Sequence, residues 1–313
     1  MRSPDFSGGM AEYKTPADHA TMMKYLEEFT VRYGFISVSF IGSSLLGRSI
    51  PMVKLGNENA KSAVLYVGAH HAMEWITTLV LLRFINEYCE LMKKGSAVSN
   101  ISMESLYNSR LIYIIPMLNP DGVELQINGI NTAGPMAPRL LSMNGGSADF
   151  THWQANGRGV DLNHNYNAGF GDYKKLERGA GIMGGCATRY SGEFAESEPE
   201  VGYLCNFVRF NSEIKAALTL HTQGEEIYYT ANGKVLRKSK NIGNLIAKMT
   251  GYKLSEPEEM ASYGGMTDWF VKELDKPSFT IECGKGVNPL PIEDFFEIYT
   301  RLRETLFTFP ILV

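Results

Sequence analysis

The sequence is poor in cysteine. It has four in 313 residues, and none of them forms a C-x-x-C pair. A zinc site built from thiolates is therefore not expected, because such sites use closely spaced cysteine pairs. Long apolar runs are also missing: none approaches the ~18 residues that span a membrane, and residues 1–10 lack the apolar core of a signal peptide. We therefore expect a cytoplasmic protein whose cysteines are reduced thiols.

Charge of either sign is in no marked excess, since 30 Lys and Arg residues stand against 34 Asp and Glu residues, for a net charge of −4. This balance gives no electrostatic reason to expect nucleic acid or an anionic membrane as a partner. Internal repeats, low-complexity tracts and linkers are absent, and 44% of the residues are hydrophobic, enough for a sizeable core. We expect residues 11–313 to form one domain, and residues 1–10 to be a vector-derived remnant or a disordered tail. The sequence indicates no oligomeric state.

Apolar and amphipathic runs alternate along the chain. Strands are predicted at residues 35–41, 50–55, 63–67, 110–116, 215–220 and 278–281. Helices are predicted at residues 17–32, 76–91 and 293–309, and another after Ser197, the expected N-cap. Residues 119–159, rich in Asn, Gly and Ser, are expected to form a long loop. The alternation predicts an α/β fold, a single-domain α/β/α sandwich with a mixed, mostly parallel central sheet.

Polar residues follow several of these strands. His71 and Glu74 come just after strand 63–67, and imidazole and carboxylate groups three residues apart can converge on one zinc ion. Asn119, His221 and Glu282 follow three other strands. Because ligands bind at the carboxyl ends of the strands in open α/β sheets, we expect these side chains to share one edge of the sheet.

The chain resembles the zinc carboxypeptidase family, the superfamily of carboxypeptidase A, over nearly its whole length. The ordered motifs that carry the resemblance are Gly68 to Ile76, Asn119-Pro120-Asp121-Gly122, Gly159 to Asn165, Ser197-Glu198-x-Glu200, Thr219 to Thr222, Gly264 to Trp269 and Phe279 to Glu282. The resemblance implies a carboxypeptidase-like fold with one zinc ion per chain, bound by His71, Glu74 and His221. It also implies that Glu282 acts as general base on the water that attacks the peptide bond.

The segment Asn163-His164-Asn165 departs from the digestive carboxypeptidases, which carry Asn-Arg-Asn and clamp the substrate's terminal carboxylate with that Arg. Imidazole does not replace the bidentate guanidinium. Asn-His here resembles the bacterial γ-D-glutamyl-L-diamino acid endopeptidases, which cut cell-wall stem peptides; neutral drift in a degenerate enzyme is the other interpretation. We expect Asn163 and His164 to bind substrate, with His164 titrating near ~6.5.

Two further positions differ from the digestive enzymes. Gln154 stands where they have the Arg that donates to the oxyanion, and Arg158, close by in the sequence, is the alternative donor or a substrate-binding group. Met260 stands where they have the mobile tyrosine. Tyr263 is instead expected to donate to the tetrahedral intermediate or to the leaving nitrogen, unless it only packs at a loop tip.

These observations predict a zinc metallopeptidase that hydrolyses the γ-D-glutamyl–diamino acid bond of peptidoglycan-derived peptides, in which the diamino acid is meso-diaminopimelate or Lys. The first alternative is a metallocarboxypeptidase that releases C-terminal L-residues from α-linked peptides. The second is a non-catalytic binder of zinc or of cell-wall fragments, against which the general base Glu282 argues. The expected partner is a small peptide substrate, without nucleic acid or membrane.

Overall fold

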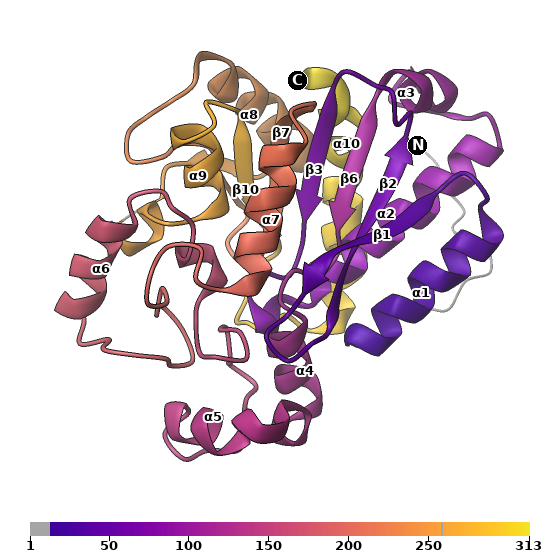
Figure 1. Cartoon of the computed structure of the whole chain (residues 1–313). Coiled ribbons are helices and arrows are strands. Elements are labelled where there is room, and N and C mark those ends of the chain that lie inside the picture. The colour runs from indigo at the N-terminus through magenta and orange to yellow at the C-terminus, as the bar shows by residue number, and fades with distance from the viewer. Residues whose placement is uncertain (1–12, 258) are drawn as a thin grey trace.

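The computed structural model describes residues 13–257 and 259–313; the predicted remnant or tail at residues 1–10 lies outside this range. An eight-stranded sheet runs through the molecule in the order β1-β2-β6-β3-β7-β10-β8-β9 (Figure 1). Its strands are β1 (Ser37–Ser43), β2 (Ser49–Gly56), β3 (Ala63–Val67), β6 (Leu111–Ile115), β7 (Ile214–His221), β8 (Glu226–Tyr228), β9 (Lys253–Ser255) and β10 (Ser278–Glu282). A separate two-stranded sheet consists of β4 (Ala97–Val98) and β5 (Ile101–Ser102).

The centre of the large sheet is parallel and its flanks are mixed. Strands β6, β3, β7 and β10 run in the same direction. Strand β2 is antiparallel to both β1 and β6, and β8 is antiparallel to β10 and parallel to β9. Every residue of β3 and β6 is buried, as expected for central strands covered on both faces. The predicted mixed sheet is thus confirmed.

Helices cover both faces of the sheet. One layer consists of α1 (His19–Arg32), α2 (Ile76–Lys93), α3 (Met103–Ser109), α8 (Arg237–Thr250) and α10 (Phe295–Leu312). The other contains α7 (Pro199–Phe210) and α9 (Met266–Lys272), and α7 lies in front of the sheet in Figure 1. Along β3, Val64 and Tyr66 pack into the first layer and Leu65 into the second, because side chains alternate across a strand. The predicted α/β/α sandwich is confirmed.

Residues 119–159 are not the continuous loop that was predicted. They contain α4 (Pro120–Asn128), a 3₁₀ helix (Ile130–Met136) and α5 (Ala137–Met143), which lie below the sheet in Figure 1. Asn119 caps α4 by accepting a hydrogen bond from Gly122 N at 3.0 Å, and Pro120 occupies the first turn. Asn followed by Pro is a helix-start signal. These two residues therefore indicate helix α4, although the Asn-, Gly- and Ser-rich composition of the segment indicates a loop. Helix α6 (Phe170–Gly179) follows further along the chain.

The predicted cap of α7 is also wrong by one residue. Glu198, not Ser197, is the N-cap. The Ser197 hydroxyl instead accepts a hydrogen bond from Asn165 Nδ2 at 3.0 Å and donates to Glu198 Oε1 at 2.9 Å. The Ser197 hydroxyl is therefore occupied by distant Asn165 and by its neighbour Glu198, and it does not cap the helix. Within the part of the chain that the structure describes, no helix is both long and apolar enough to cross a bilayer.

Candidate active site

The carboxyl ends of β3, β7 and β10 meet at one edge of the sheet. In the parallel pair β10–β7, Glu282 lies beside His221, and in the pair β3–β7, Val67 lies beside Thr219. His71 and Glu74 come from the turn and the short 3₁₀ helix (Ala72–Glu74) that follow β3. The sheet thus gathers residues far apart in the sequence, as the strand-end pattern predicted.

Asn119 does not join them at the pocket. Its side chain is fully buried, and Nδ2 donates to the backbone oxygens of His70 at 3.0 Å and Ala155 at 3.2 Å. The same segment supports the turn after β3 through backbone bonds from Leu118 to Gly68 and from Asn119 to Ala69. Asn119 therefore has a structural role: it fixes the turn that carries His71.

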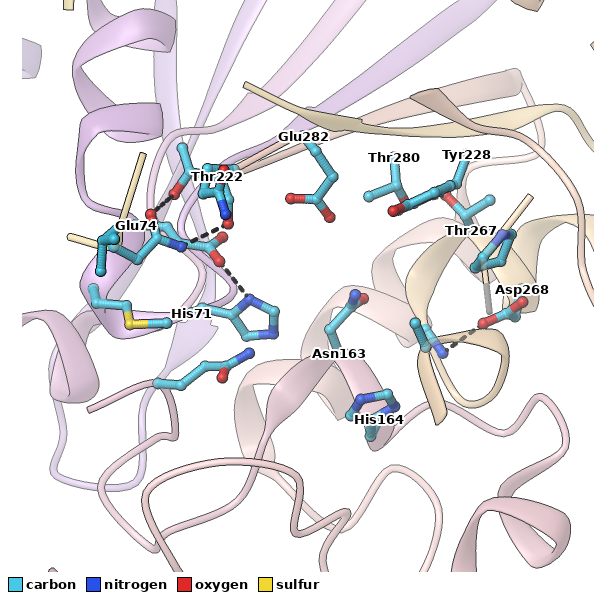
Figure 2. Close-up of a pocket in the computed structure, with 18 of the residues that line it drawn as sticks. His71, Glu74, Asn163, His164, Thr222, Tyr228, Thr267, Asp268, Thr280 and Glu282 are labelled. Carbon is cyan, nitrogen blue, oxygen red and sulfur yellow. Dashed lines mark hydrogen bonds and ion pairs between the residues drawn. The ribbon is translucent and has the colours of Figure 1, made fainter. Parts of the chain in front are cut away.

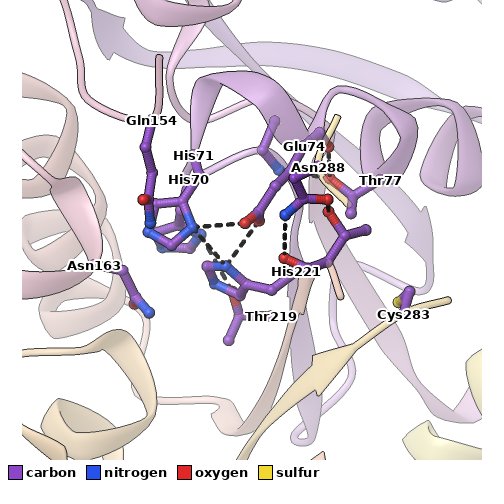
Figure 3. Close-up of polar contacts among 12 residues, drawn as sticks. His70, His71, Glu74, Thr77, Gln154, Asn163, Thr219, His221, Cys283 and Asn288 are labelled. Atoms are coloured by element: carbon purple, nitrogen blue, oxygen red, sulfur yellow. Dashed lines mark hydrogen bonds and ion pairs between the residues drawn. The ribbon is translucent and has the colours of Figure 1, made fainter. Parts of the chain in front are cut away.

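His71, Glu74 and His221 bring three ligand atoms within 4.8 Å of one another, and all three residues are buried (Figure 3). His71 Nδ1 lies 2.9 Å from Glu74 Oε1, and His221 Nδ1 lies 3.0 Å from Glu74 Oε2. The two Nδ1 atoms are 3.2 Å apart. Two nitrogens bound to one tetrahedral zinc at ~2.0–2.1 Å lie about 3.3 Å apart, so this spacing fits a shared zinc ion.

The donor set also fits zinc chemically. Two imidazoles and one carboxylate from a protein, with a fourth position left open, are the usual ligands of a catalytic zinc. His221 Nε2 is buried and, among the described residues, has no hydrogen-bond partner, which leaves Nδ1 as the nitrogen with neighbours suited to a metal. The structure therefore contains a possible His-Glu-His zinc site.

Asp161 orients His71 from the side opposite Glu74. Its Oδ1 lies 3.0 Å from His71 Nε2, and its carboxylate is fully buried. Burial by itself lowers the pKa of His71, but Glu74 and Asp161 outweigh it and raise that pKa well above its usual value. A carboxylate on the second nitrogen of a metal-ligating histidine fixes the ring and its tautomer. In the sequence, Asp161 stands within the Gly159 to Asn165 motif, and no separate role is predicted for it there.

Glu282 lines a pocket of about 430 Å³ together with His71 and Glu74 (Figure 2). Burial, together with the charge of Glu74, raises the pKa of Glu282 to about 8. A carboxyl group in a cleft whose pKa lies near neutrality has the affinity for protons that a general base or acid needs. The placement beside His221 on the neighbouring strand suits the predicted role.

The far end of the pocket is lined by hydroxyl groups. This hydroxyl-lined end consists of Tyr228, Thr267 and Thr280, with Asp268 beside them (Figure 2); Thr230 also lines the pocket. Asp268 accepts a hydrogen bond from Gly265 N at 3.0 Å, and burial raises its pKa to about 8. Among the described residues that line the pocket, none is lysine or arginine. Its polarity therefore comes from hydroxyls, amides, imidazoles and carboxylates.

Asn163 and His164 both line the pocket, as expected of substrate-binding groups. His164 Nδ1 lies 2.8 Å from the carbonyl oxygen of Tyr263, to which it donates, and its ring stacks on Tyr173 at 4.0 Å between centroids. Burial lowers the pKa of His164, although Asp161 acts in the opposite direction. The expected titration near ~6.5 is therefore wrong: the ring is neutral at neutral pH, and Nε2 is an acceptor.

The structure separates the remaining candidates. Gln154 lines the pocket near His71 (Figure 3), whereas Arg158 does not line it and places Nη1 3.7 Å from Glu198 Oε1. Tyr263 is also not among the lining residues, and its ring lies close to Gly169. Of the two expected oxyanion donors, only Gln154 is at the pocket; the catalytic role of Tyr263 stays a prediction that this arrangement does not support.

Comparisons with known proteins agree with the site. The zinc carboxypeptidase family matches residues 22–304. The chain is 33% identical over 283 residues to gamma-D-glutamyl-L-diamino acid endopeptidase 1 of Lysinibacillus sphaericus, covering 90% of this chain and 69% of that protein. It is also 33% identical over 298 residues to uncharacterized protein YqgT of Bacillus subtilis, covering 95% of this chain and 78% of that protein.

The fold is shared with solved structures, among them carboxypeptidase A from Helicoverpa armigera, with a TM-score of 0.71 at 19% identity, covering 96% of this chain and 75% of that chain. Bovine thrombin-activatable fibrinolysis inhibitor, in complex with tick carboxypeptidase inhibitor, superposes with a TM-score of 0.73 at 20% identity, covering 96% of this chain and 97% of that chain. The family match spans well over half of the sequence and includes the gathered His-Glu-His cluster. The chain therefore belongs to the zinc carboxypeptidase family and is a metallopeptidase, an enzyme that hydrolyses peptide bonds.

Proposed function

We propose that this enzyme hydrolyses the γ-D-glutamyl–diamino acid bond of peptidoglycan-derived peptides, with one zinc ion per chain held by His71, Glu74 and His221. The observation that carries the proposal is that none of the described residues lining the pocket is lysine or arginine. Neutral His164 stands at the position of the carboxylate clamp of digestive carboxypeptidases. The relative from Lysinibacillus sphaericus, whose name states this specificity, supports it. A location in the cytoplasm remains our expectation.

We assign a group of the pocket to each step of the proposed hydrolysis. His71, Glu74 and His221 would hold the zinc ion, which when bound would lower the pKa of a water ligand toward ~7 and polarise the scissile carbonyl. Glu282 accepts the proton of the attacking water and passes it to the leaving amine. Gln154 donates a hydrogen bond to the carbonyl oxygen as that oxygen gains negative charge.

The leaving residue is expected to occupy the pocket between Asn163 and the hydroxyl-lined end. His164 presents an acceptor there because Nδ1–H is already donated to the Tyr263 carbonyl, and an acceptor attracts an ammonium and repels a carboxylate. Burial keeps the Asp268 carboxyl protonated, and among the described residues it forms no ion pair; an ammonium in the hydroxyl-lined end would favour its ionised form and then pair with it. A diamino acid, with its second amine, supplies that group.

The test compares two substrate classes at matched concentrations: an L-Ala-γ-D-Glu-diaminopimelate tripeptide, and hippuryl-Phe with hippuryl-Arg. We expect kcat/KM to be at least tenfold higher for the γ-D-glutamyl substrate. His164→Arg is expected to weaken turnover of that substrate and to raise activity on hippuryl peptides. The neutral control His164→Asn is expected to weaken turnover of the γ-D-glutamyl substrate without raising activity on hippuryl peptides. Preference of the parent enzyme for hippuryl peptides would show that it is an ordinary metallocarboxypeptidase.

The metal assignment is tested by elemental analysis. The parent protein is expected to hold one zinc ion per chain, and His71→Ala, Glu74→Ala and His221→Ala to lose it, because removing one of three ligands greatly weakens the site. His152→Ala serves as the control, since this exposed histidine is not among the three expected ligands and bonds to the Asn288 carbonyl instead. Zinc retained at full occupancy by His221→Ala would show that this ligand is wrongly assigned.

A further inference from the structure

Residues 187–190 contact two parts of the active site at once. The carbonyl oxygen of Ala187 accepts hydrogen bonds from the backbone N–H groups of Gln154 and Ala155, both at 3.0 Å. The Thr188 hydroxyl lies 2.5 Å from Gln154 Oε1. This short segment therefore holds both the backbone and the side chain of the proposed oxyanion donor.

The same segment also holds the carboxylate that orients His71. Arg189 N donates to Asp161 Oδ2 at 3.2 Å, and Asp161 N donates to the carbonyl oxygen of Tyr190 at 2.7 Å. Asp161 in turn lies 3.0 Å from His71 Nε2. Adjacent residues of one segment thus support the oxyanion donor on one side and a metal ligand on the other.

In the structure, the contact with Thr188 engages the oxygen of the Gln154 amide. An amide has an oxygen that accepts and a nitrogen that donates, so a rotation of 180° about its last torsion exchanges the two. Gln154 Oε1 carries no hydrogen, so Thr188 must be the donor in this pair. With the oxygen held by Thr188, the Nε2–H groups remain for the pocket. Rotated, the amide would present its oxygen to a carbonyl oxygen that is gaining negative charge.

We propose that Thr188 is a positioning residue, whose hydroxyl locks the Gln154 amide with its donor face toward the scissile carbonyl. The inference rests on the proposed role of Gln154 in peptide hydrolysis, but not on the preference for diamino acids. A guanidinium at residue 154 would need no such partner, because all of its N–H groups are donors. The neutral donor of this chain makes a second residue necessary.

The first experiment measures steady-state kinetics on whichever peptide the parent enzyme cleaves best. Thr188→Val, which keeps the shape and removes the hydroxyl, is expected to lower kcat about tenfold or more with little change in KM. The expected loss in kcat does not exceed the roughly 10²–10³-fold loss seen when an oxyanion donor is deleted. Thr188→Ser keeps the hydroxyl and is expected to stay within about threefold of the parent; if Thr188→Val does not fold, Thr188→Ala takes its place. No loss in either hydroxyl-free variant, or an equal loss in Thr188→Ser, overturns the proposal.

A double-mutant cycle tests whether Thr188 acts through Gln154. Gln154→Ala is expected to lower kcat, and Thr188→Val to add no further loss in that background. In a Gln154→Arg background, Thr188→Val is expected to change kcat by less than about twofold. A full, additive loss in either background shows that Thr188 acts by another route and overturns the proposal.

Two readouts independent of turnover complete the test. Zinc content, and zinc affinity by chelator competition, are expected to be unchanged in Thr188→Val, because Asp161 is held by the backbone of the segment. Affinity for a phosphinic analogue of the cleaved peptide is expected to fall in parallel with kcat/KM. Loss of zinc with unchanged analogue binding contradicts the proposal. A preference of the parent enzyme for hippuryl peptides would refute the proposed substrate specificity but not the role of Thr188. That role is tested by the kinetic, zinc-binding and analogue-binding measurements.

Discussion

Glu282 is the proposed general base of the hydrolysis. Glu282→Gln is expected to lower kcat on the order of 10²–10⁴, because the amide has the same shape but cannot accept the proton. Folding and zinc content are expected to match the parent, as measured by circular dichroism and elemental analysis. Glu104→Gln is the control, since Glu104 is exposed on α3 and does not line the pocket. A Glu282→Gln enzyme within threefold of the parent would show that another group is the base.

Asp268 makes stability depend on pH. Because burial raises its pKa to about 8, the folded protein keeps this proton at pH values where the unfolded chain, with a pKa near ~3.9, has lost it. This contribution to the free energy of unfolding therefore falls as pH rises from about 4 to about 8. Asp268→Asn cannot ionise and keeps an acceptor for Gly265 N, so the stability of the variant relative to the parent is expected to increase across that window.

Urea denaturation at four pH values between 5 and 8 measures this difference. Asp172→Asn is the control, since Asp172 is exposed on α6 and the pKa of its carboxyl is lowered by Lys175. A stability difference between Asp268→Asn and the parent that stays constant with pH would mean that Asp268 is already ionised in the folded protein at neutral pH.

At the scale of elements, the pocket depends on how closely the start of α9 approaches the segment that carries His164. Gly264 has φ +75°, and a Cβ there would lie 2.7 Å from the carbonyl oxygen of His164. Just beyond it, Met266 N donates to Asn163 Oδ1 at 3.1 Å. The first turn of α9 therefore sets the position of both expected substrate-binding residues.

Gly264→Ala is expected to cost more stability than the ~1–2 kcal/mol of a left-handed alanine, because it adds a clash with backbone. It is also expected to raise KM several-fold by displacing Asn163 and His164. Gly146→Ala is the matched control, with φ +84° and open space around its Cβ. Urea denaturation and Michaelis kinetics measure both effects. Equal stability losses and an unchanged KM in the two variants would contradict this account.

At the scale of the whole molecule, the proposed zinc ion joins the ends of two central strands. His71 and Glu74 follow β3, and His221 ends β7, so the ion links segments about 150 residues apart in the chain. An ion that binds only the folded protein stabilises it by mass action, about 4 kcal/mol at a thousandfold excess over Kd. Removal of zinc by a chelator is expected to lower Tm by on the order of 10 °C.

The His221→Ala variant isolates this effect, because its Tm is expected to be insensitive to the chelator. His152→Ala, which leaves the ligands intact, is expected to respond like the parent. Differential scanning fluorimetry with and without chelator, followed by re-addition of zinc, makes the measurement. A parent Tm that does not change on chelation would mean that the site does not hold the ion in solution.

Many local features follow from the sequence alone. Strand β3 has the predicted bounds, and β6 differs from its prediction by one residue at each end. Short, apolar runs rich in β-branched residues suit central strands that are covered on both faces. The convergence of His71, Glu74, His221 and Glu282 also follows, since parallel strands bring their carboxyl ends to one edge. Helix α4 could have been predicted from Asn119-Pro120, but the loop-like composition of residues 119–159 concealed it.

Tertiary structure decided which polar side chains reach the pocket and which are used elsewhere. Arg158 and Gln154 are four residues apart, yet only Gln154 lines the pocket, because Arg158 extends toward buried Glu198. Asp161 and Thr188 become supports of the site only through contacts with distant residues, which no local pattern encodes. Sequence periodicity determines which residues are buried and which strands are central, whereas a long polar side chain finds its partner among groups that only the folded chain brings within hydrogen-bond distance.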